Sequence, residues 1–408
     1  MDHIVMDYRG IKISGILVNE SNGIITVKLD NGYNMSFDKS SVEIIERKTI
    51  ESAKNHEITS FETGNGDHEV TILATGGTIA SRIDYRTGAV SPVFDPSKIF
   101  KSKPKIQEDM TIRIRSVLNE MSENMSPDDW IKIAGAARDE MKSGRGIVIA
   151  HGTDTMSYSA SAASFMFSRQ SSPIIFVGSQ RSSDRPSSDA FSNLEAALYF
   201  SVSDFGETGI AMHAGLSNSP IALHRAVRSR KMHTSRRDAF QSIESPIAGK
   251  FSLGNVELRP GYRKISDELE MSDKLDKKVS IIYSHPSLSD DDIINMAAGK
   301  DAVILMGTGL GHVSSNLIGT IRRMIKDGTY FVMTSQCIYG TVNMNVYSTG
   351  RLLTQAGVIS AGSMLPEVAY VKAMYVLANY DHEDFKNIMG ENLRGEILER
   401  EILKEVIL

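Results

Sequence analysis

From residue 70 onward, apolar runs broken by glycine alternate with amphipathic stretches along the chain. Two of the clearest apolar runs are 70–74 and 146–150, which are apolar at nearly every position. Strands of this kind are typical of parallel sheets that carry helices on both faces. The pattern therefore predicts an α/β fold built on parallel sheets. Further runs with the same character lie at 173–180, 209–213, 279–283, 302–306 and 330–333.

Residues 1–50 follow a different pattern, in which short β-like runs alternate with tight turns. The runs 12–18 and 24–29 are joined by a hairpin loop, and a turn at 30–34 precedes another short run at 34–37. Several short strands separated by tight turns predict a small all-β module of the barrel or SH3-like kind. This module would precede the α/β part of the chain.

A chain of 408 residues is long for one domain, so two or three domains are expected. The changes in pattern predict five segments. They are an all-β module at 1–50, a linker at 51–68, a large α/β catalytic domain at 69–255, a linker at 256–277 and a smaller α/β domain at 278–408.

Two helices are indicated by their end signals or composition. Ser126, with Pro127 behind it and two aspartates in the first turn, predicts a helix over 127–142. The charged, leucine-bearing run from 383 to 408 is expected to be helical and to pack or dock.

Composition and charge exclude several classes of protein. Hydrophobic residues make up 41% and charged residues 23%, which is ordinary for a globular chain. The net charge of −5 gives no support for broad attraction to nucleic acid or membranes. Residues 1–60 hold 7 Lys and Arg against 9 Asp and Glu, a balance of −2, so the module lacks a basic RNA-binding footprint. Protein docking or packing is the favoured role for it.

Cysteine use and the absence of targeting signals predict a cytoplasmic protein. Cys337 is the only cysteine, which excludes an intrachain disulfide and suits a reducing compartment. The chain has no basic-then-apolar start and no apolar run near 20 residues, so neither secretion nor a membrane span is expected.

The two clearest strands each end in a glycine turn that carries hydroxyl groups. Strand 70–74 is followed by Thr-Gly-Gly-Thr-Ile-Ala-Ser at 75–81, and strand 146–150 by His-Gly-Thr-Asp-Thr at 151–155. Ligands of open α/β sheets bind outside the carboxyl ends of the strands. Two such turns on parallel strands would therefore face the same cleft.

As an ordered pair, these two segments resemble the signatures of the bacterial-type asparaginase and glutaminase family. The resemblance covers roughly residues 70–370. It implies amide hydrolysis with Thr78 as the first nucleophile, and it places Tyr85 beside Thr78. The polar loop 82–90 that carries Tyr85 is a candidate lid.

The resemblance also implies a second catalytic set, formed by Thr153, Asp154 and Lys231. Lys-x-x-Thr at 231–234, followed by Asp-Ala-Phe at 238–240, matches the family's catalytic lysine segment. Asp154 would orient Lys231, and Lys231 would take a proton from Thr153 or from water. The order in which the two threonines act stays open. Most arginines around Lys231 are expected on a solvated face. Crowding by Arg228, Arg230 and Arg236, together with burial of the lysine, would lower the lysine pKa and favour a neutral amine.

Substrate contacts are implied for Ser122 and Glu123. They match the family position that holds the α-amino and α-carboxylate groups, although Glu123 stands where many members carry Gln. A plain turn is the alternative at this position. The backbone N–H groups of Gly77 and Gly152 are candidate donors to the oxyanion.

No cofactor is expected in this chain. The loop 307–312 is rich in glycine but departs from the dinucleotide-binding pattern and lacks its acidic partner. No Walker motif and no cluster with metal-ligand spacing is present in the sequence.

The all-β front end, with Leu-Asp-Asn-Gly-Tyr-Asn at 29–34, resembles the D subunits of archaeal-type glutamyl-tRNA(Gln) amidotransferases. That resemblance implies that this chain releases ammonia from L-glutamine. A partner, the E subunit, would carry ATP and Mg²⁺ and convert Glu-tRNA(Gln) to Gln-tRNA(Gln), contacting most of the tRNA. Self-association into a homodimer, and a heterotetramer with the partner, are also implied.

Two other functions compete with this one. A free-standing cytoplasmic L-asparaginase would need no partner, and the N-terminal module argues against it. A non-catalytic scaffold with the same fold would be expected to lose part of the catalytic set, whereas Thr78, Thr153, Asp154 and Lys231 are all present.

Overall fold

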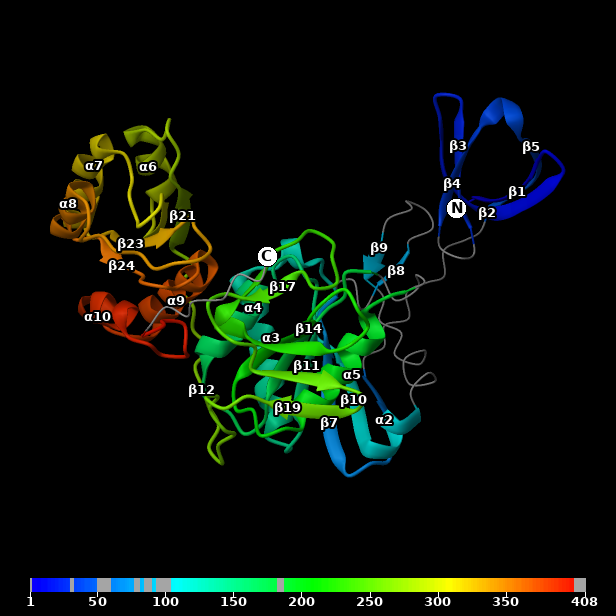
Figure 1. Ribbon diagram of the computed structural model, residues 1–408, viewed down its shortest axis with the longest axis horizontal. Helices are drawn as coiled ribbons and strands as arrows, with labels where there is room; N and C mark the ends of the chain where they lie inside the picture. The colour runs from blue at the N-terminus through cyan, green and yellow to red at the C-terminus, as the bar shows by residue number, and fades with distance from the viewer. Residues whose placement is uncertain are drawn as a thin grey trace.

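The computed structural model describes residues 2–29, 33–49, 60–76, 81–83, 90–92, 104–181 and 187–399. These residues form an all-β unit at the N-terminus, a large α/β lobe and a smaller α/β lobe (Figure 1). The α/β fold with a preceding all-β module, predicted from the hydrophobic pattern, is confirmed.

The N-terminal unit is a five-stranded antiparallel sheet in the order β4-β3-β2-β1-β5. Its core consists of Ile4, Met6, Ile25, Val27 and Phe37. The turn between β2 and β3 has only two residues, both with positive φ, as the right-handed twist of a hairpin favours. The strands are β1 (Asp2–Tyr8), β2 (Ile11–Ser21), β3 (Ile24–Leu29), β4 (Asn34–Asp38) and β5 (Glu43–Thr49).

The large lobe is built on a nine-stranded sheet in the order β19-β18-β15-β14-β13-β11-β7-β10-β6. The five central strands, β14 to β10 in that order, are parallel, and the strands outside them pair antiparallel. The sheet is therefore parallel at its centre and mixed as a whole. Its strands are β6 (Ser60–Thr63), β7 (His68–Ala74), β10 (Met110–Ser116), β11 (Gly146–Ala150), β13 (Ile174–Val177), β14 (Thr208–His213), β15 (Ile221–Arg225), β18 (Gly249–Ser252) and β19 (Asn255–Leu258).

Helices cover both faces of this sheet, which explains why its central strands are apolar throughout. Leu73 and Ile149 pack on the side of α3 (Pro127–Met141) and α4 (Met156–Met166). Ile72 and Val148 pack on the other side, with α5 (Ala190–Ser201) and the short α2 (Pro104–Asp109). Helix α3 begins where its sequence signals predict, and the Asp129 carboxylate accepts hydrogen bonds from the backbone and the side chain of Ser126.

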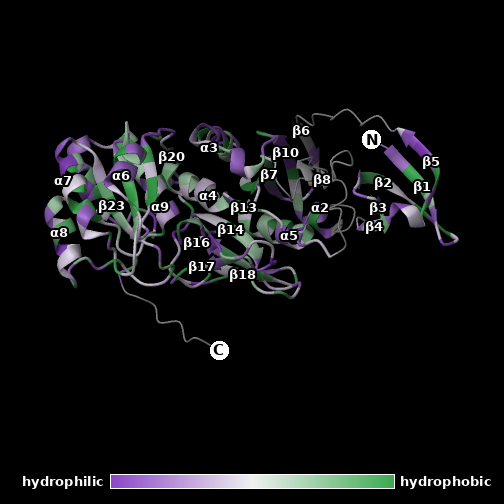
Figure 2. Ribbon diagram, turned by 90° about the horizontal axis from the view of Figure 1, so that it is seen from above, coloured by the Kyte–Doolittle hydropathy of each residue, from purple (hydrophilic) through white to green (hydrophobic). Residues whose placement is uncertain are grey.

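The smaller lobe is a four-stranded parallel sheet in the order β21-β22-β23-β24. Figure 2, in which β23, α6, α7 and α8 are labelled, shows this lobe at the end of the molecule opposite to the N-terminal unit. Helices α6, α7 and α8 pack on one face of the sheet. Helix α9 (Pro366–Asn379) packs on the other face and also against α4 of the large lobe, so one apolar core runs through both lobes. The remaining elements are β21 (Val279–Tyr283), β22 (Ala302–Gly307), β23 (Tyr330–Ser335), β24 (Ile359–Ser360), α6 (Asp290–Ala297), α7 (Ile318–Lys326), α8 (Ser348–Ala356) and α10 (Phe385–Gly390).

The connections differ from the sequence prediction. The predicted linker 51–68 contains β6, which forms one edge of the large sheet. The predicted linker 256–277 contains most of β19 and all of β20 (Glu270–Met271), which pairs with β12 (Phe167–Arg169). These stretches resemble linkers in sequence because exposed edge strands are polar and lack the apolar run of a buried strand.

The C-terminal prediction is wrong for residues 391–399. Helix α10 ends at Gly390, and the chain from 391 to 399 is not helical. Here side chains take up backbone N–H groups that a helix would use: Asn392 accepts from Gly395, and the Glu396 carboxylate accepts from Arg394. None of the helices among the described residues has the length and apolar character needed to cross a membrane.

Candidate active site

The site lies at the carboxyl ends of β7 and β11, neighbours at the centre of the large sheet. From β7 the chain continues to β10 on one side, whereas from β11 it continues to β13 on the other. This reversal opens a crevice at the strand ends, where open α/β sheets bind their ligands. Ala74 and Ala150, the last residues of the two strands, are register partners, so the turns that follow them start side by side.

The first turn is fixed to the second strand by Thr75. Its backbone N–H and its hydroxyl both donate to the carbonyl of Ala150, at 3.1 and 2.9 Å. Gly76 has a φ of +107°, and a Cβ at this position would lie 2.2 Å from the carbonyl oxygen of Glu120. Only glycine fits here.

Three residues of the predicted site lie outside the described residues. They are Gly77, Thr78 and Tyr85. Strands β8 (Ser81–Ile83) and β9 (Val90–Pro92) pair on either side of the candidate lid, of which residues 84–89 are also outside the described part. The roles assigned to these residues stay predictions.

The structure brings Lys231 together with Thr153 and Asp154. The Lys231 Nζ lies 2.9 Å from Thr153 Oγ1 and 2.7 Å from Asp154 Oδ1, although the lysine follows Thr153 by 78 residues in sequence. Lys231 ends β16 (Ser229–Lys231), and its side chain is 14% exposed, whereas that of Asp154 is 67% exposed. The amine is thus held between a buried hydroxyl and a carboxylate open to solvent. This is the geometry that a base acting on Thr153 requires.

The arginines around Lys231 have partners of their own. Arg236 pairs with Asp238 at 2.5 Å, and Arg230 pairs with Glu367 at 3.3 Å. Arg228 is fully buried and donates to backbone carbonyls, so it is an exception to the expectation that most of these arginines lie on a solvated face. Sequence alone could not show this, because the carbonyls that receive its hydrogen bonds come from distant segments.

Ser122 lies against the turn that carries Thr153. A Cβ at Gly152 would lie 2.7 Å from Ser122 Cβ and 2.8 Å from its Oγ. The Thr155 hydroxyl donates to the Ser122 carbonyl at 2.6 Å. Ser122 is buried and Glu123 is exposed. The predicted substrate position therefore borders the catalytic turn, although its substrate contacts stay predictions. The role of Thr155 was not predicted, and its only signal was its place in the same hydroxyl-rich run.

His151 supports the same turn, a role that its sequence context did not predict. Its Nδ1 lies 2.7 Å from the Gly152 carbonyl, and because a carbonyl can only accept, Nδ1 carries the proton. Complete burial lowers the pKa of His151 to about 4. The imidazole is therefore neutral at neutral pH and holds the Gly152 carbonyl in place.

This burial predicts a pH dependence of stability. The folded-state pKa of His151, about 4, lies below its ordinary value of 6.5, so the unfolded chain binds the proton more readily. Stability from this residue is complete above pH 6.5 and is lost as pH falls toward 4, by about 3 kcal/mol. We expect His151→Asn to remove that part of the slope in urea unfolding between pH 7 and 4. Parallel stability curves for the two proteins would contradict the assignment.

A buried polar network holds the neighbouring turn, after β13, against Thr153. The Asp189 carboxylate accepts from the backbone N–H of Gln180, and the Asn193 amide donates to the Gly178 carbonyl. A Cβ at Gly178 would lie 2.7 Å from the Thr153 methyl group. Asp189 and Asn193, at the start of α5, thus contribute to the packing of the catalytic turn.

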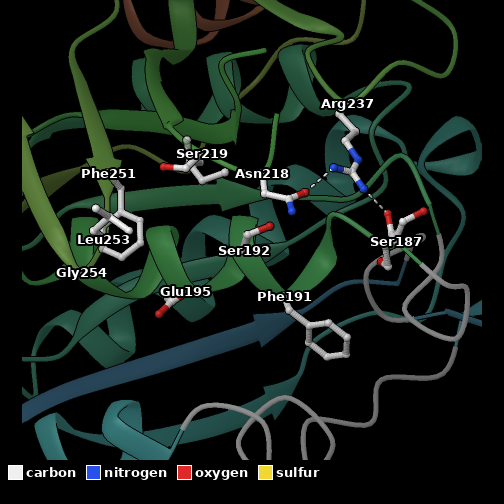
Figure 3. Close-up of a pocket in the computed structure, with 12 residues that line it drawn as sticks. Ser187, Phe191, Ser192, Glu195, Asn218, Ser219, Arg237, Phe251, Leu253 and Gly254 are labelled. Carbon is white, nitrogen blue, oxygen red and sulfur yellow. Dashed lines mark hydrogen bonds between the residues drawn. The ribbon is translucent and has the colours of Figure 1, made fainter. Parts of the chain in front are cut away.

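A separate hollow of about 470 Å³ lies on the large lobe beside α5 (Figure 3). The Arg237 guanidinium bridges its rim, donating to Asn218 Oδ1 at 2.6 Å and to the Ser187 carbonyl at 2.5 Å. Of the catalytic candidates that the structure describes, none lines this hollow. Arg237 therefore joins two surface loops.

Comparison with known proteins extends the likeness to almost the whole chain. The family "Asparaginase, N-terminal" matches residues 69–262, and the "Glutaminase/Asparaginase C-terminal domain" matches residues 278–389. The D subunit of a glutamyl-tRNA(Gln) amidotransferase from Thermoplasma volcanium is 55% identical over 95% of this chain and 95% of its own length. The chain belongs to the asparaginase family, among the amidotransferase D subunits. The Pyrococcus furiosus D subunit is 45% identical over 92% of this chain and 87% of its own.

Solved structures confirm the asparaginase fold. The thermostable L-asparaginase from Thermococcus kodakarensis is 32% identical with a TM-score of 0.75, covering 81% of this chain and 100% of its own. L-asparaginase I from Vibrio cholerae is 31% identical with a TM-score of 0.70, covering 81% of this chain and 99% of its own. About a fifth of this chain thus has no counterpart in these two asparaginases, whereas the D subunits above match more than nine-tenths of it.

Proposed function

We propose that this chain hydrolyses the side-chain amide of L-glutamine and supplies the ammonia to a partner, the E subunit, of a tRNA-dependent amidotransferase. The observation that carries the proposal is the contact of Lys231 with Thr153 and Asp154 beside the crevice at the carboxyl ends of β7 and β11. It is supported by relatives over nearly the full length that are named as D subunits of this amidotransferase.

The first half of the proposed reaction takes place on Thr78. Its hydroxyl attacks the amide carbon, with Tyr85 close by, and the N–H groups of Gly77 and Gly152 stabilise the negative oxygen that forms. The C–N bond then breaks, the nitrogen takes up a proton, and ammonia leaves. The substrate remains as an ester on Thr78, held through its α-amino and α-carboxylate groups by Ser122 and Glu123.

The second half uses the lysine set. The water oxygen bonds to the ester carbon, and Lys231, oriented by Asp154, takes the proton of that water either directly or through the Thr153 hydroxyl, which gives its own proton to the lysine and takes one from the water. The ester bond breaks, its oxygen regains a proton as the Thr78 hydroxyl, and glutamate leaves. The close approach of the Lys231 amine to the Thr153 hydroxyl supports this route. If Thr153 attacked first, the two threonines would exchange roles.

The ATP-dependent steps are assigned to the partner, which would hold ATP and Mg²⁺. The glycine-rich loop after β22 is a poor phosphate cradle, because the N–H groups of Thr308, Gly311 and His312 all donate to carbonyls within the loop. Glu-tRNA(Gln) would be bound mainly by the partner. We place the assembly in the cytoplasm, as a homodimer of this chain joined to the partner in a heterotetramer, and the free, exposed Cys337 suits that compartment.

The alternative is a free-standing L-asparaginase, which the solved structures of that name suggest. Ammonia release from glutamine and from asparagine distinguishes the two functions. We expect the purified chain to release ammonia from glutamine in preference to asparagine, and to support Gln-tRNA formation when the E subunit, ATP and Glu-tRNA are added. Rapid hydrolysis of asparagine with no response to the partner would establish the asparaginase instead. No hydrolysis of either amide under any condition would leave the scaffold function.

A further inference from the structure

The strand that ends in Lys231 is also attached to the smaller lobe. Successive side chains of a strand point to opposite sides, and β16 uses both sides. Lys231 contacts Thr153 in the large lobe, whereas the preceding Arg230 pairs with Glu367 at 3.3 Å. Glu367 lies in the first turn of α9, and its side chain is only 6% exposed. The catalytic lysine therefore adjoins a partly buried ion pair between the lobes.

Arg228 makes a second attachment, three residues before Lys231. Its Nη1 donates to the Ser363 carbonyl at 2.8 Å and to the Glu396 carbonyl at 3.0 Å. Its Nε and Nη2 donate to the Ile243 carbonyl of the loop that follows β17 (Phe240–Ser242), the strand paired with β16. A fully buried guanidinium thus joins three segments at the boundary of the lobes.

The acceptors of Arg228 are themselves fixed by a buried ionic contact. The Glu396 carboxylate lies 2.6 Å from Lys372 Nζ of α9, and both side chains are 0% exposed. Because a buried charge is costly without its partner, this pair holds the C-terminal segment, residues 391–399, on α9. The neighbouring Leu398 N–H donates to the Ser363 hydroxyl at 2.8 Å. Residues 363 and 396 are thereby kept together beneath Arg228.

The same C-terminal segment holds the other half of the catalytic contact. Arg394 donates to the carbonyls of Ser164 and Phe165, at 2.9 and 3.1 Å, in the last turn of α4. Helix α4 begins at Met156, directly after the turn that carries Thr153 and Asp154. One segment of the smaller lobe therefore fastens both elements that bring Lys231 to Thr153.

We propose that the smaller lobe sets the separation of Lys231 from Thr153, with Arg230 and Arg228 as positioning residues for the lysine. The proposal rests on the proposed function, because hydrolysis of glutamine is its readout. A base that is displaced by a fraction of an ångström loses rate in the chemical step and not in substrate binding. Loss of the contacts that Arg230 and Arg228 make with the smaller lobe should therefore lower kcat and leave KM nearly unchanged.

The test uses Arg230, whose side chain is 32% exposed and can be replaced with less risk than the buried Arg228. In the full chain we expect Arg230→Met to lower kcat for glutamine about tenfold with KM changed less than about twofold. Arg230→Lys keeps a cation near Glu367 and should recover kcat to within about threefold of the original. Arg236→Met is the matched control, because its ion pair with Asp238 lies in the same segment and stays within the large lobe.

A background without the lysine separates positioning from a general loss of structure. In Lys231→Ala, adding Arg230→Met should reduce the remaining rate less than about twofold, because the group being positioned is gone. If Arg230→Met does not fold, Glu367→Gln tests the proposal instead, because it weakens the same ion pair from the side of α9. We expect it to lower kcat about threefold. An unchanged kcat, or an equal further loss in the Lys231→Ala background, would overturn the proposal. An original chain that hydrolyses neither amide would instead remove the proposed function.

Discussion

Replacing Lys231 by alanine is expected to lower ammonia release from glutamine by about 10³-fold or more, with the chain still folded. The amine lies 2.9 Å from the Thr153 hydroxyl, and alanine removes the group that would take its proton. Folding should tolerate the change, because the Asp154 carboxylate that loses its partner is 67% exposed and stays hydrated, and ion pairs with an exposed carboxylate contribute little stability. Steady-state ammonia release and a thermal unfolding curve test both statements.

The matched control is Lys250→Ala. Lys250 is also a lysine paired with a carboxylate, Glu257, at 3.0 Å, but it lies on the outer strands β18 and β19. Its replacement should leave the rate of glutamine hydrolysis within about twofold of that of the original chain. Thr78→Ala, Thr153→Ala and Asp154→Ala should each cause a loss as large as that of Lys231→Ala, and combinations should add little because the residues act as a unit. Normal glutaminase activity in any of the four variants would remove that residue from the mechanism.

The second large effect is stimulation by the partner, which we expect to raise glutamine hydrolysis about a hundredfold. A dedicated ammonia donor that ran freely would waste glutamine, so the isolated chain should spend most of its time in a less active arrangement. If about 0.1% of molecules are competent, a partner that favours the competent arrangement by about 3 kcal/mol raises that share to roughly 14%, which is an increase of about this size. The measurement is glutamine hydrolysis by the chain alone, with the E subunit, and with both the E subunit and Glu-tRNA(Gln).

Two comparisons make this experiment decisive. Uncharged tRNA should stimulate less than Glu-tRNA(Gln), because only the charged form presents an acceptor for ammonia. A chain with Lys231→Ala should stay inactive under all three conditions, which shows that any activity comes from this site and not from a contaminant. Should the isolated chain already run as fast as the complete mixture and prefer asparagine, the amidotransferase function would fail.

The hydrophobic pattern by itself determined the architecture of this protein. Strands at 70–74 and 146–150 are apolar on both faces because helices cover both faces, and this information is local in the sequence. The glycine turns that follow them were also predictable, since Gly76 and Gly152 occupy places where a side chain would collide with a neighbouring segment. The segments 75–81 and 151–155 together carried the family resemblance, and the comparisons confirm it.

Elements with weak local signals were missed or misassigned. Strand β5 is polar at most positions, because only one side of an edge strand in a small sheet meets a core. The chain after Gly390 has helical composition, yet the side chains of Asn392 and Glu396 take its backbone N–H groups. Competition between a side chain and a helix is settled by packing, and composition does not report it.

The tertiary structure alone decided which polar groups meet. Lys231 reaches Thr153 because the sheet order sets β11 and β14 on either side of β13, and the chain returns from β14 through β15 to β16. Arg228 lies in the most basic stretch, and the sequence could not show that it is buried. The carbonyls of Ser363 and Glu396 that accept its hydrogen bonds lie 135 and 168 residues away. Local patterns fix strands, helices and turns, since these depend on neighbours in sequence. Partners of buried charges depend on the distant segments that folding brings to them, and here those segments belong to the smaller lobe.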